Sequence, residues 1–142
     1  MKKKLLVSKC LLGFPCRYDG KSKGNAAVCA LREKYDLVPA CPEVLGGLPT
    51  PRVPSERQGE RVVMRDGTDV TENYRRGAEA AWEIYQKEGC CAALLNKRSP
   101  SCGAGEIYDG SFSRRLVPGD GVTAELLREK GVPLYDEENL PK

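Results

Sequence analysis

The chain has 142 residues, which is enough for one domain over residues 1–142 with a buried core. Hydrophobic residues make up 40% and charged residues 30%, and this composition excludes a disordered or membrane-spanning protein. The balance of 23 basic and 20 acidic side chains is too even to indicate a duplex nucleic acid as the required partner. The apolar run Leu5–Val7 is too short for a signal-peptide core, so we expect a cytoplasmic protein.

Cysteine is frequent in this chain, and histidine is absent. In the reducing cytoplasm the cysteines are expected to bind metal or a cluster, or to be small buried hydrophobic residues, rather than to form disulfides. The absence of histidine excludes mixed Cys/His zinc sites and histidine-based triads, so proton transfer needs Glu, Asp, Lys, Tyr or Cys. The seven cysteines are Cys10, Cys16, Cys29, Cys41, Cys90, Cys91 and Cys102.

The first forty residues predict a strand, a loop, a helix and a second strand. Residues 5–8 are a short apolar run, and the glycines and prolines after them are typical of a loop. Asn25 is a suitable cap for a helix that continues to about Tyr35. Residues 36–40 then form the second apolar run, which leads directly into Cys41.

The middle of the chain predicts a long loop, a hairpin and a long helix. Residues 44–60 contain so many glycines and prolines that we expect no regular element there, but an ordered functional loop. Residues 61–70 are typical of a hairpin around Asp66-Gly67. Thr71 is expected to cap a helix over about 72–88, which has an apolar stripe at helical spacing.

The last third predicts a central strand, a hairpin, a helix and an edge strand. Residues 90–95 are apolar without alternation, as in a parallel strand that is covered on both faces. Residues 107–112 are expected to form a small hairpin around their Asp-Gly pair. A helix then begins at Asp120 or Thr123 and ends near Lys130, and a short edge strand follows at 132–135.

Strands that alternate with helices predict a three-layer, Rossmann-like α/β domain: a mainly parallel sheet flanked by helices, with one or two small β-hairpins. Ligands bind such sheets at the carboxyl ends of the strands. Cys10 follows the first strand, Cys41 follows the second, and Cys102 lies a short loop beyond the central one. We therefore expect the three thiols at one rim, where soft ligands suit an iron–sulfur cluster, zinc or copper(I).

These residues leave other interpretations open. The cysteines could be scattered and buried, as is expected for Cys29, Cys90 and Cys91. Cys16 could be a fourth ligand, and the chain would then be a four-cysteine zinc-binding or redox-sensing module. A third interpretation is an accessory protein of tRNA thio-modification, for which the lysine-rich start and Arg114-Arg115 give slight support; an RNA partner is otherwise not indicated.

Five motifs follow one another along the chain: CLLGFPCRYDG at residues 10–20, CPE at 41–43, GGLPTPR at 46–52, SPSCG at 99–103 and IYDG at 107–110. In this order they resemble the thiouracil desulfidase family, long catalogued as a domain of unknown function. The resemblance spans nearly the whole chain.

The resemblance implies a [4Fe–4S] cluster with three cysteine ligands, which by motif are Cys10, Cys41 and Cys102. One iron stays open and binds the sulfur of a thiolated pyrimidine, either a thiouracil-like base or a nucleotide, while water attacks the ring carbon without electron transfer. In the family a glutamate and a serine serve this step. The Cys-Pro-Glu context matches the glutamate to Glu43. The serine is Ser101 or Ser99, and we favour Ser101. The chain is thus expected to be a hydrolytic desulfurase that acts on a small molecule, with no membrane partner.

Four further residues are expected to line the pocket. Cys16 matches a family cysteine, but three-cysteine ligation leaves it no ligand role. Asp19 could orient the substrate or simply form a turn. Lys97 could offset the negative charge of the cluster or be solvated. Gly103 would let the backbone approach the cluster closely.

Overall fold

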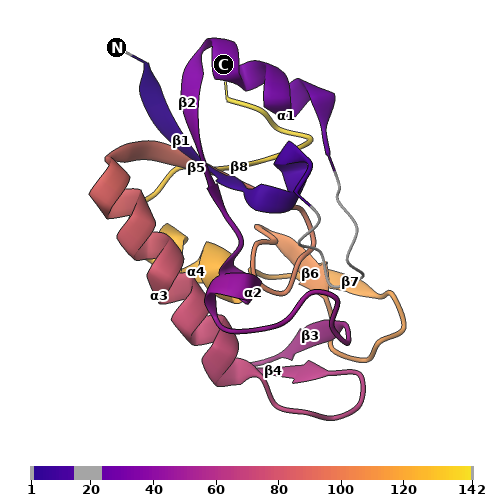
Figure 1. Ribbon diagram of the computed structural model, residues 1–142. Helices are drawn as coiled ribbons and strands as arrows, with labels where there is room; N and C mark the ends of the chain where they lie inside the picture. Colours follow the sequence, from indigo (N-terminus) through magenta and orange to yellow (C-terminus); the bar gives the residue numbers. More distant parts are fainter. Residues whose placement is uncertain (1, 15–23, 142) are drawn as a thin grey trace.

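A parallel four-stranded sheet forms the centre of the computed structural model, which describes residues 2–14 and 24–141. The strand order is β2-β1-β5-β8, and every neighbouring pair is parallel (Figure 1). This confirms the predicted α/β class and the mainly parallel sheet. The strands are β1 (Lys3–Ser8), β2 (Tyr35–Ala40), β5 (Cys90–Leu95) and β8 (Leu134–Asp136).

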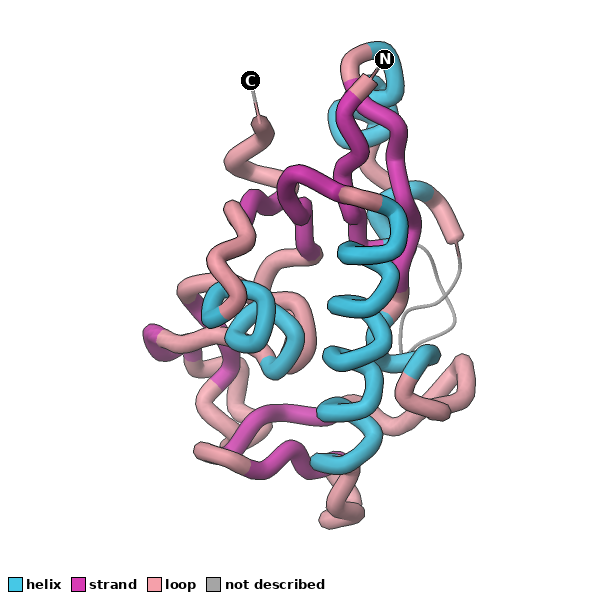
Figure 2. Tube along the Cα trace, turned by 90° about the vertical axis from the view of Figure 1, so that its left-hand side faces the viewer, coloured by secondary structure: helices cyan, strands magenta, loops and turns pink. Residues whose placement is uncertain are grey.

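Helices cover both faces of this sheet, which gives three layers. On one face lie α1 (Ala26–Ala30) and a 3₁₀ turn, η2 (Leu31–Glu33). On the other face, α3 (Thr71–Glu88) and α4 (Val122–Glu129) pack side by side (Figures 1 and 2). Within the described part of the chain, no helix combines the length and the apolar character needed to cross a membrane.

Alternating apolar side chains explain why β1 lies in the middle of the sheet. Leu5 and Val7 are fully buried against α1 and η2. Leu6 is buried on the opposite face, in the cluster that contains Leu127 of α4. The side chains of β5 also alternate between the two faces of the sheet. Cys91 at its amino end is exposed, so the predicted burial on both faces begins only at Ala92.

Two antiparallel hairpins lie beyond the carboxyl ends of the sheet strands, and they confirm the one or two small hairpins that the sequence predicts (Figure 1). In the first, β3 (Ser55–Gln58) pairs with β4 (Arg61–Met64). In the second, β6 (Glu106–Tyr108) pairs with β7 (Leu116–Pro118). A small core of Leu48, Val62, Val70 and Tyr74 joins the first hairpin to α3.

The partners in both hairpins differ from the prediction. The predicted turn at Asp66-Gly67 exists, but β4 pairs mainly with β3, which lies in the segment 44–60 where no regular element is expected. The sequence of β3, Ser-Glu-Arg-Gln, has no apolar alternation, so only its pairing with β4 reveals it as a strand. In the second hairpin, β6 pairs with β7 rather than across the Asp-Gly pair, and the amide of Gly110 in the connecting loop donates to the Glu56 carboxylate.

Of the two predicted helix caps, the structure confirms Asn25 but not Thr71. Asn25 is the cap of α1, and its side chain accepts a hydrogen bond from the amide of Val28 at 3.0 Å. Thr71 is the first residue of α3 rather than its cap, because its hydroxyl accepts from the amide of Val62 at 2.9 Å. The side chain that accepts from Thr71 N is Asp69, at 2.9 Å.

Candidate active site

A cavity of about 420 Å³ opens where the carboxyl ends of β1, β2 and β5 meet the two hairpins. This is the edge of the sheet at which the parallel topology predicts a ligand site. Residues that directly follow each of the three strands line one side of the cavity, and residues of the hairpins and their loops line the other side.

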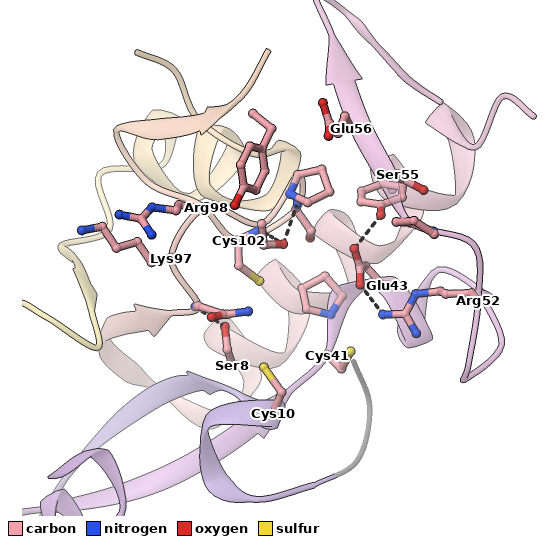
Figure 3. A pocket seen from close by; sticks show the side chains of 18 of the residues that line it. Ser8, Cys10, Cys41, Glu43, Arg52, Ser55, Glu56, Lys97, Arg98 and Cys102 are labelled. Atoms are coloured by element: carbon pink, nitrogen blue, oxygen red, sulfur yellow. Dashed lines mark hydrogen bonds and ion pairs between the residues drawn. The ribbon is translucent and has the colours of Figure 1, made fainter. Parts of the chain in front are cut away.

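The three cysteines named by the sequence all line this cavity. Cys10 lies in a 3₁₀ turn, η1 (Lys9–Leu12), directly after β1; Cys41 precedes the short helix α2 (Pro42–Leu45); Cys102 lies in the loop after β5. Figure 3 shows their thiols pointing toward a common space. Three separate loops therefore bring three soft donors together, as the topology predicts.

Cys102 is a deeply buried thiol. Only 5% of the residue is exposed. Burial raises the pKa of Cys102 to about 12, although hydrogen bonding with Ser8 lowers it in part. Ser8 ends β1 and also accepts the amide hydrogen of Asn96 through its hydroxyl at 2.8 Å, so it links the ends of β1 and β5 at the cavity. The sequence gives no sign of this role, since Ser8 looks like an ordinary strand end.

Glu43 reaches the cavity from the first turn of α2, two residues after Cys41. Its Oε2 is paired with the Arg52 guanidinium, and its Oε1 accepts a hydrogen bond from the Tyr74 hydroxyl at 2.5 Å (Figure 3). Burial lowers the pKa of Arg52, but the Glu43 carboxylate outweighs this effect and the pKa is raised. Burial, and then the Glu43 charge, raise the pKa of Tyr74 well above its usual value.

Two glycines allow α2 to lie close enough to α3 to present Cys41 and Glu43. A Cβ at Gly46 would come within 1.9 Å of the Asn73 carbonyl oxygen, and a Cβ at Gly77 within 1.9 Å of the Pro42 carbonyl oxygen. The Asn73 side chain also donates to Gly46 O at 2.9 Å. Gly46 is therefore a packing residue, while Arg52, at the end of the same motif, lines the cavity.

Both candidate serines line the cavity, but their hydroxyls have different partners. Ser99 Oγ accepts the amide hydrogens of Ser101 and Cys102 at 3.1 and 3.0 Å, so it shapes the loop. Ser101 is 1% exposed, and its Oγ lies 2.7 Å from the Thr123 hydroxyl oxygen. The structure thus brings both serines to the site, and it adds Thr123 as a partner that the sequence does not reveal.

The four predicted pocket residues have different outcomes. Lys97 lines the cavity, and its Nζ lies 2.9 Å from a carboxylate oxygen of Glu138; this hydrogen bond is the main reason why the pKa of Lys97 is raised. Gly103 is not among the residues that line the cavity, contrary to the prediction, and its amide donates to Ser99 O at 2.8 Å. A Cβ there would be 2.7 Å from the same oxygen, so the glycine permits the turn. Cys16 and Asp19 lie outside the described residues.

The far wall of the cavity is the part that the sequence mostly missed. Of the residues of this wall, Tyr108 alone belongs to one of the five motifs of the family resemblance. Three residues of the wall, Arg98, Phe112 and Arg114, have positive φ values of 67°, 58° and 63°. Such backbone conformations are rare outside glycine and cluster at functional sites, but they leave no signature in a sequence. The wall is formed by Glu56, Arg65, Arg98, Tyr108, Phe112 and Arg114.

Fold and site together define an α/β protein that presents three thiols and a carboxylate in one cavity at the carboxyl edge of a parallel sheet. The 2-thiouracil desulfurase family matches residues 5–139, and the chain belongs to this family. This confirms the family resemblance that the five motifs indicate.

Two individual proteins are similar over nearly the full length. A solved structure described as the [4Fe-4S]-dependent thiouracil desulfidase TudS (DUF523Vcz) is 49% identical, with a TM-score of 0.93, over 99% of this chain and 94% of that one. The "Uncharacterized protein YbbK" of Bacillus subtilis (strain 168) is 39% identical over 146 residues, covering 96% of this chain and 97% of that protein. The high TM-score agrees with the three-layer architecture.

Proposed function

We propose that this chain is a [4Fe–4S]-dependent desulfidase that removes the sulfur of a thiolated pyrimidine, either a thiouracil-like base or its nucleotide. The convergence of Cys10, Cys41 and Cys102 on one cavity beside Glu43 is the observation that carries the proposal. Family membership and the similarity to a solved thiouracil desulfidase support it. The reducing cytoplasm, which keeps such cysteines as thiols, is the compartment in which we expect the enzyme.

The residues of the cavity fit a cluster held by Cys10, Cys41 and Cys102. Thiols are the donors that iron–sulfur clusters use. Across residues 2–14 and 24–141, no three Cys, Asp or Glu side chains are placed to hold a metal ion. The fit therefore rests on the chemistry of three thiol donors that line one cavity. When bound, a cluster with three cysteine ligands supplies an iron with a free coordination position, which acts as a Lewis acid toward sulfur.

Glu43 is the residue that we assign to proton transfer. Its side chain is 17% exposed, and the residue lines the cavity. In our proposal Glu43 accepts a proton from the water that attacks the thiocarbonyl carbon. The water oxygen becomes the new carbonyl oxygen and the sulfur leaves as hydrogen sulfide, so the reaction is balanced without an oxidant or a reductant. Ser101 is our candidate for the assisting hydroxyl, with Ser99 as the alternative.

The test is anaerobic reconstitution, measurement of iron and sulfide, and assay of sulfide release from 2-thiouracil and 4-thiouracil. We expect about four iron atoms per chain and catalytic sulfide release. Cys102→Ser should lose both, whereas Glu43→Gln should keep the iron and retain only a small residual turnover. Cys29→Ser is the matched control, because Cys29 is a free cysteine outside the cavity lining. A colourless protein with stoichiometric zinc and no sulfide release would instead support the zinc-binding module.

A further inference from the structure

We infer that Arg52 and Tyr74 are positioning residues that fix the Glu43 carboxylate in the orientation that the reaction needs; this inference rests on the proposed function. The two donors come from different elements, the segment after α2 and the helix α3, and each occupies one oxygen of the same carboxylate. Sequence motifs assign neither residue to the reaction, and the helical spacing of Tyr74 predicts only a core aromatic.

Both donors are themselves held in place. The Arg52 side chain is 2% exposed, and its Nη1 donates to the Pro49 carbonyl oxygen at 3.1 Å and to the Thr50 hydroxyl at 3.2 Å. Tyr74 is 1% exposed, and its hydroxyl also forms a hydrogen bond with Ser55. Two buried donors, each held by further hydrogen bonds, therefore bind the two oxygens of the carboxylate. This arrangement is expected where neighbouring residues orient a reacting group.

These two donors restrict the orientation of the Glu43 carboxylate. A carboxylate on a free glutamate side chain rotates among many orientations, and only a few of them point a lone pair at a water beside the substrate. With Oε1 held by Tyr74 and Oε2 held by Arg52, the group is fixed at the cavity wall with its remaining lone pairs available there. Loss of either donor would release this orientation without removing the base itself.

The alternative is that the Arg52–Glu43 pair merely anchors the chain after α2. The protein contains a second arginine of similar kind, Arg57, which pairs with Glu125 at 2.8 Å while its side chain is 11% exposed. Arg57 lies outside the lining of the cavity. It therefore serves as a control for the loss of a buried arginine ion pair that has no contact with the site.

The experiment compares Tyr74→Phe, Arg52→Met and Arg52→Lys with two controls, Arg57→Met and Tyr85→Phe; Tyr85 is a tyrosine of α3 that lies outside the cavity lining. All variants are studied as reconstituted protein with measured iron content and melting temperature. For Tyr74→Phe and Arg52→Met we expect wild-type iron content, a KM for 2-thiouracil within about twofold, and a kcat lowered about tenfold or more. Arg52→Lys should restore part of kcat. The two controls should keep the kcat of the wild type whatever their melting temperature.

Double variants separate positioning from a general loss of structure. If Tyr74 and Arg52 act through Glu43, then adding either substitution to Glu43→Gln should lower kcat no further. Full kcat in Tyr74→Phe and Arg52→Met, or an additive loss on top of Glu43→Gln, would overturn the inference. If the reconstituted wild type itself released no sulfide from 2-thiouracil or 4-thiouracil, the proposed function would fail, and this result is distinct from either of those outcomes.

Discussion

Ser101 lines the candidate site, yet its hydroxyl forms a hydrogen bond with Thr123, a residue outside the cavity lining. Ser101 is almost fully buried, and its Oγ lies 2.7 Å from the hydroxyl oxygen of Thr123, the second residue of α4. The backbone of the same serine accepts from the amides of Thr123 and Ala124 at 2.8 and 3.1 Å. Ser101 therefore anchors α4 and also lines the cavity, and mutations can separate these two roles.

We predict that Ser101→Ala costs both stability and turnover, and that Thr123→Val added to it restores only stability. The single change leaves the buried Thr123 hydroxyl without its partner, at a cost of about 1–3 kcal/mol in the free energy of unfolding. Removing both hydroxyls relieves most of this cost, because no unsatisfied group remains. Urea denaturation and sulfide-release assays measure the two effects.

Ser99→Ala is the comparison for this pair of variants. Its hydroxyl accepts two backbone amides and shapes the loop that carries Cys102, so its loss should lower cluster content as well as stability. If instead the double variant Ser101→Ala with Thr123→Val had full activity, Ser101 would have only an anchoring role, and Ser99 would become the favoured serine.

At the scale of elements, the contact between α2 and α3 sets the place of Cys41 and Glu43. We predict that Gly77→Ala destabilises the fold by about 1–3 kcal/mol and lowers the cluster content, because the new Cβ would meet the Pro42 carbonyl oxygen and push α2 away. Iron analysis and thermal denaturation measure these effects. Glu79→Ala, at an exposed position of the same helix, is the control, and wild-type iron content in Gly77→Ala would contradict the account.

The start of α3 gives a prediction about pH. Hydrogen bonds from Thr71, and then from Arg61, lower the pKa of Asp69 from 3.8 to about 2. A carboxyl group whose pKa is lower in the folded state stabilises the fold above the unfolded value, and this contribution disappears as pH falls to the folded value. The stability lost in Asp69→Asn should thus be constant above about pH 4 and shrink toward pH 2. Urea titrations across this range measure it; a loss independent of pH would contradict the prediction.

Elements whose signal is local were predictable from the sequence, and elements that depend on a distant partner were not. The apolar runs of β1 and β5 and the cap at Asn25 carry their own evidence, and the structure has them. Strand β3 is polar and pairs with β4, while β6 pairs with β7 across a loop whose Gly110 and Phe112 amides donate to Glu56. Contacts between residues far apart in the chain override the local secondary-structure preference here, and no short stretch of the sequence contains both partners.

At the scale of the whole molecule, topology explains why half of the cavity could be predicted. Parallel strands bring the residues that follow them to one edge, so the positions of Cys10, Cys41 and Cys102 follow from strand order alone. Most of the opposite wall comes from the two hairpins and their loops, and no rule of strand order places a hairpin over a sheet. Residues such as Arg65 and Phe112 therefore appear only in the structure.

A group that binds all three cysteines would join three loops of the sheet edge, so we predict that cluster binding raises the melting temperature of the protein. Only the folded chain brings Cys10, Cys41 and Cys102 together, and a ligand that binds only the folded state stabilises it. Calorimetry of reconstituted and chelator-treated protein measures the shift. Cys102→Ser should lose it and Cys29→Ser should keep it. Equal melting temperatures for protein with four irons and protein with none would contradict the shared ligation of these three loops.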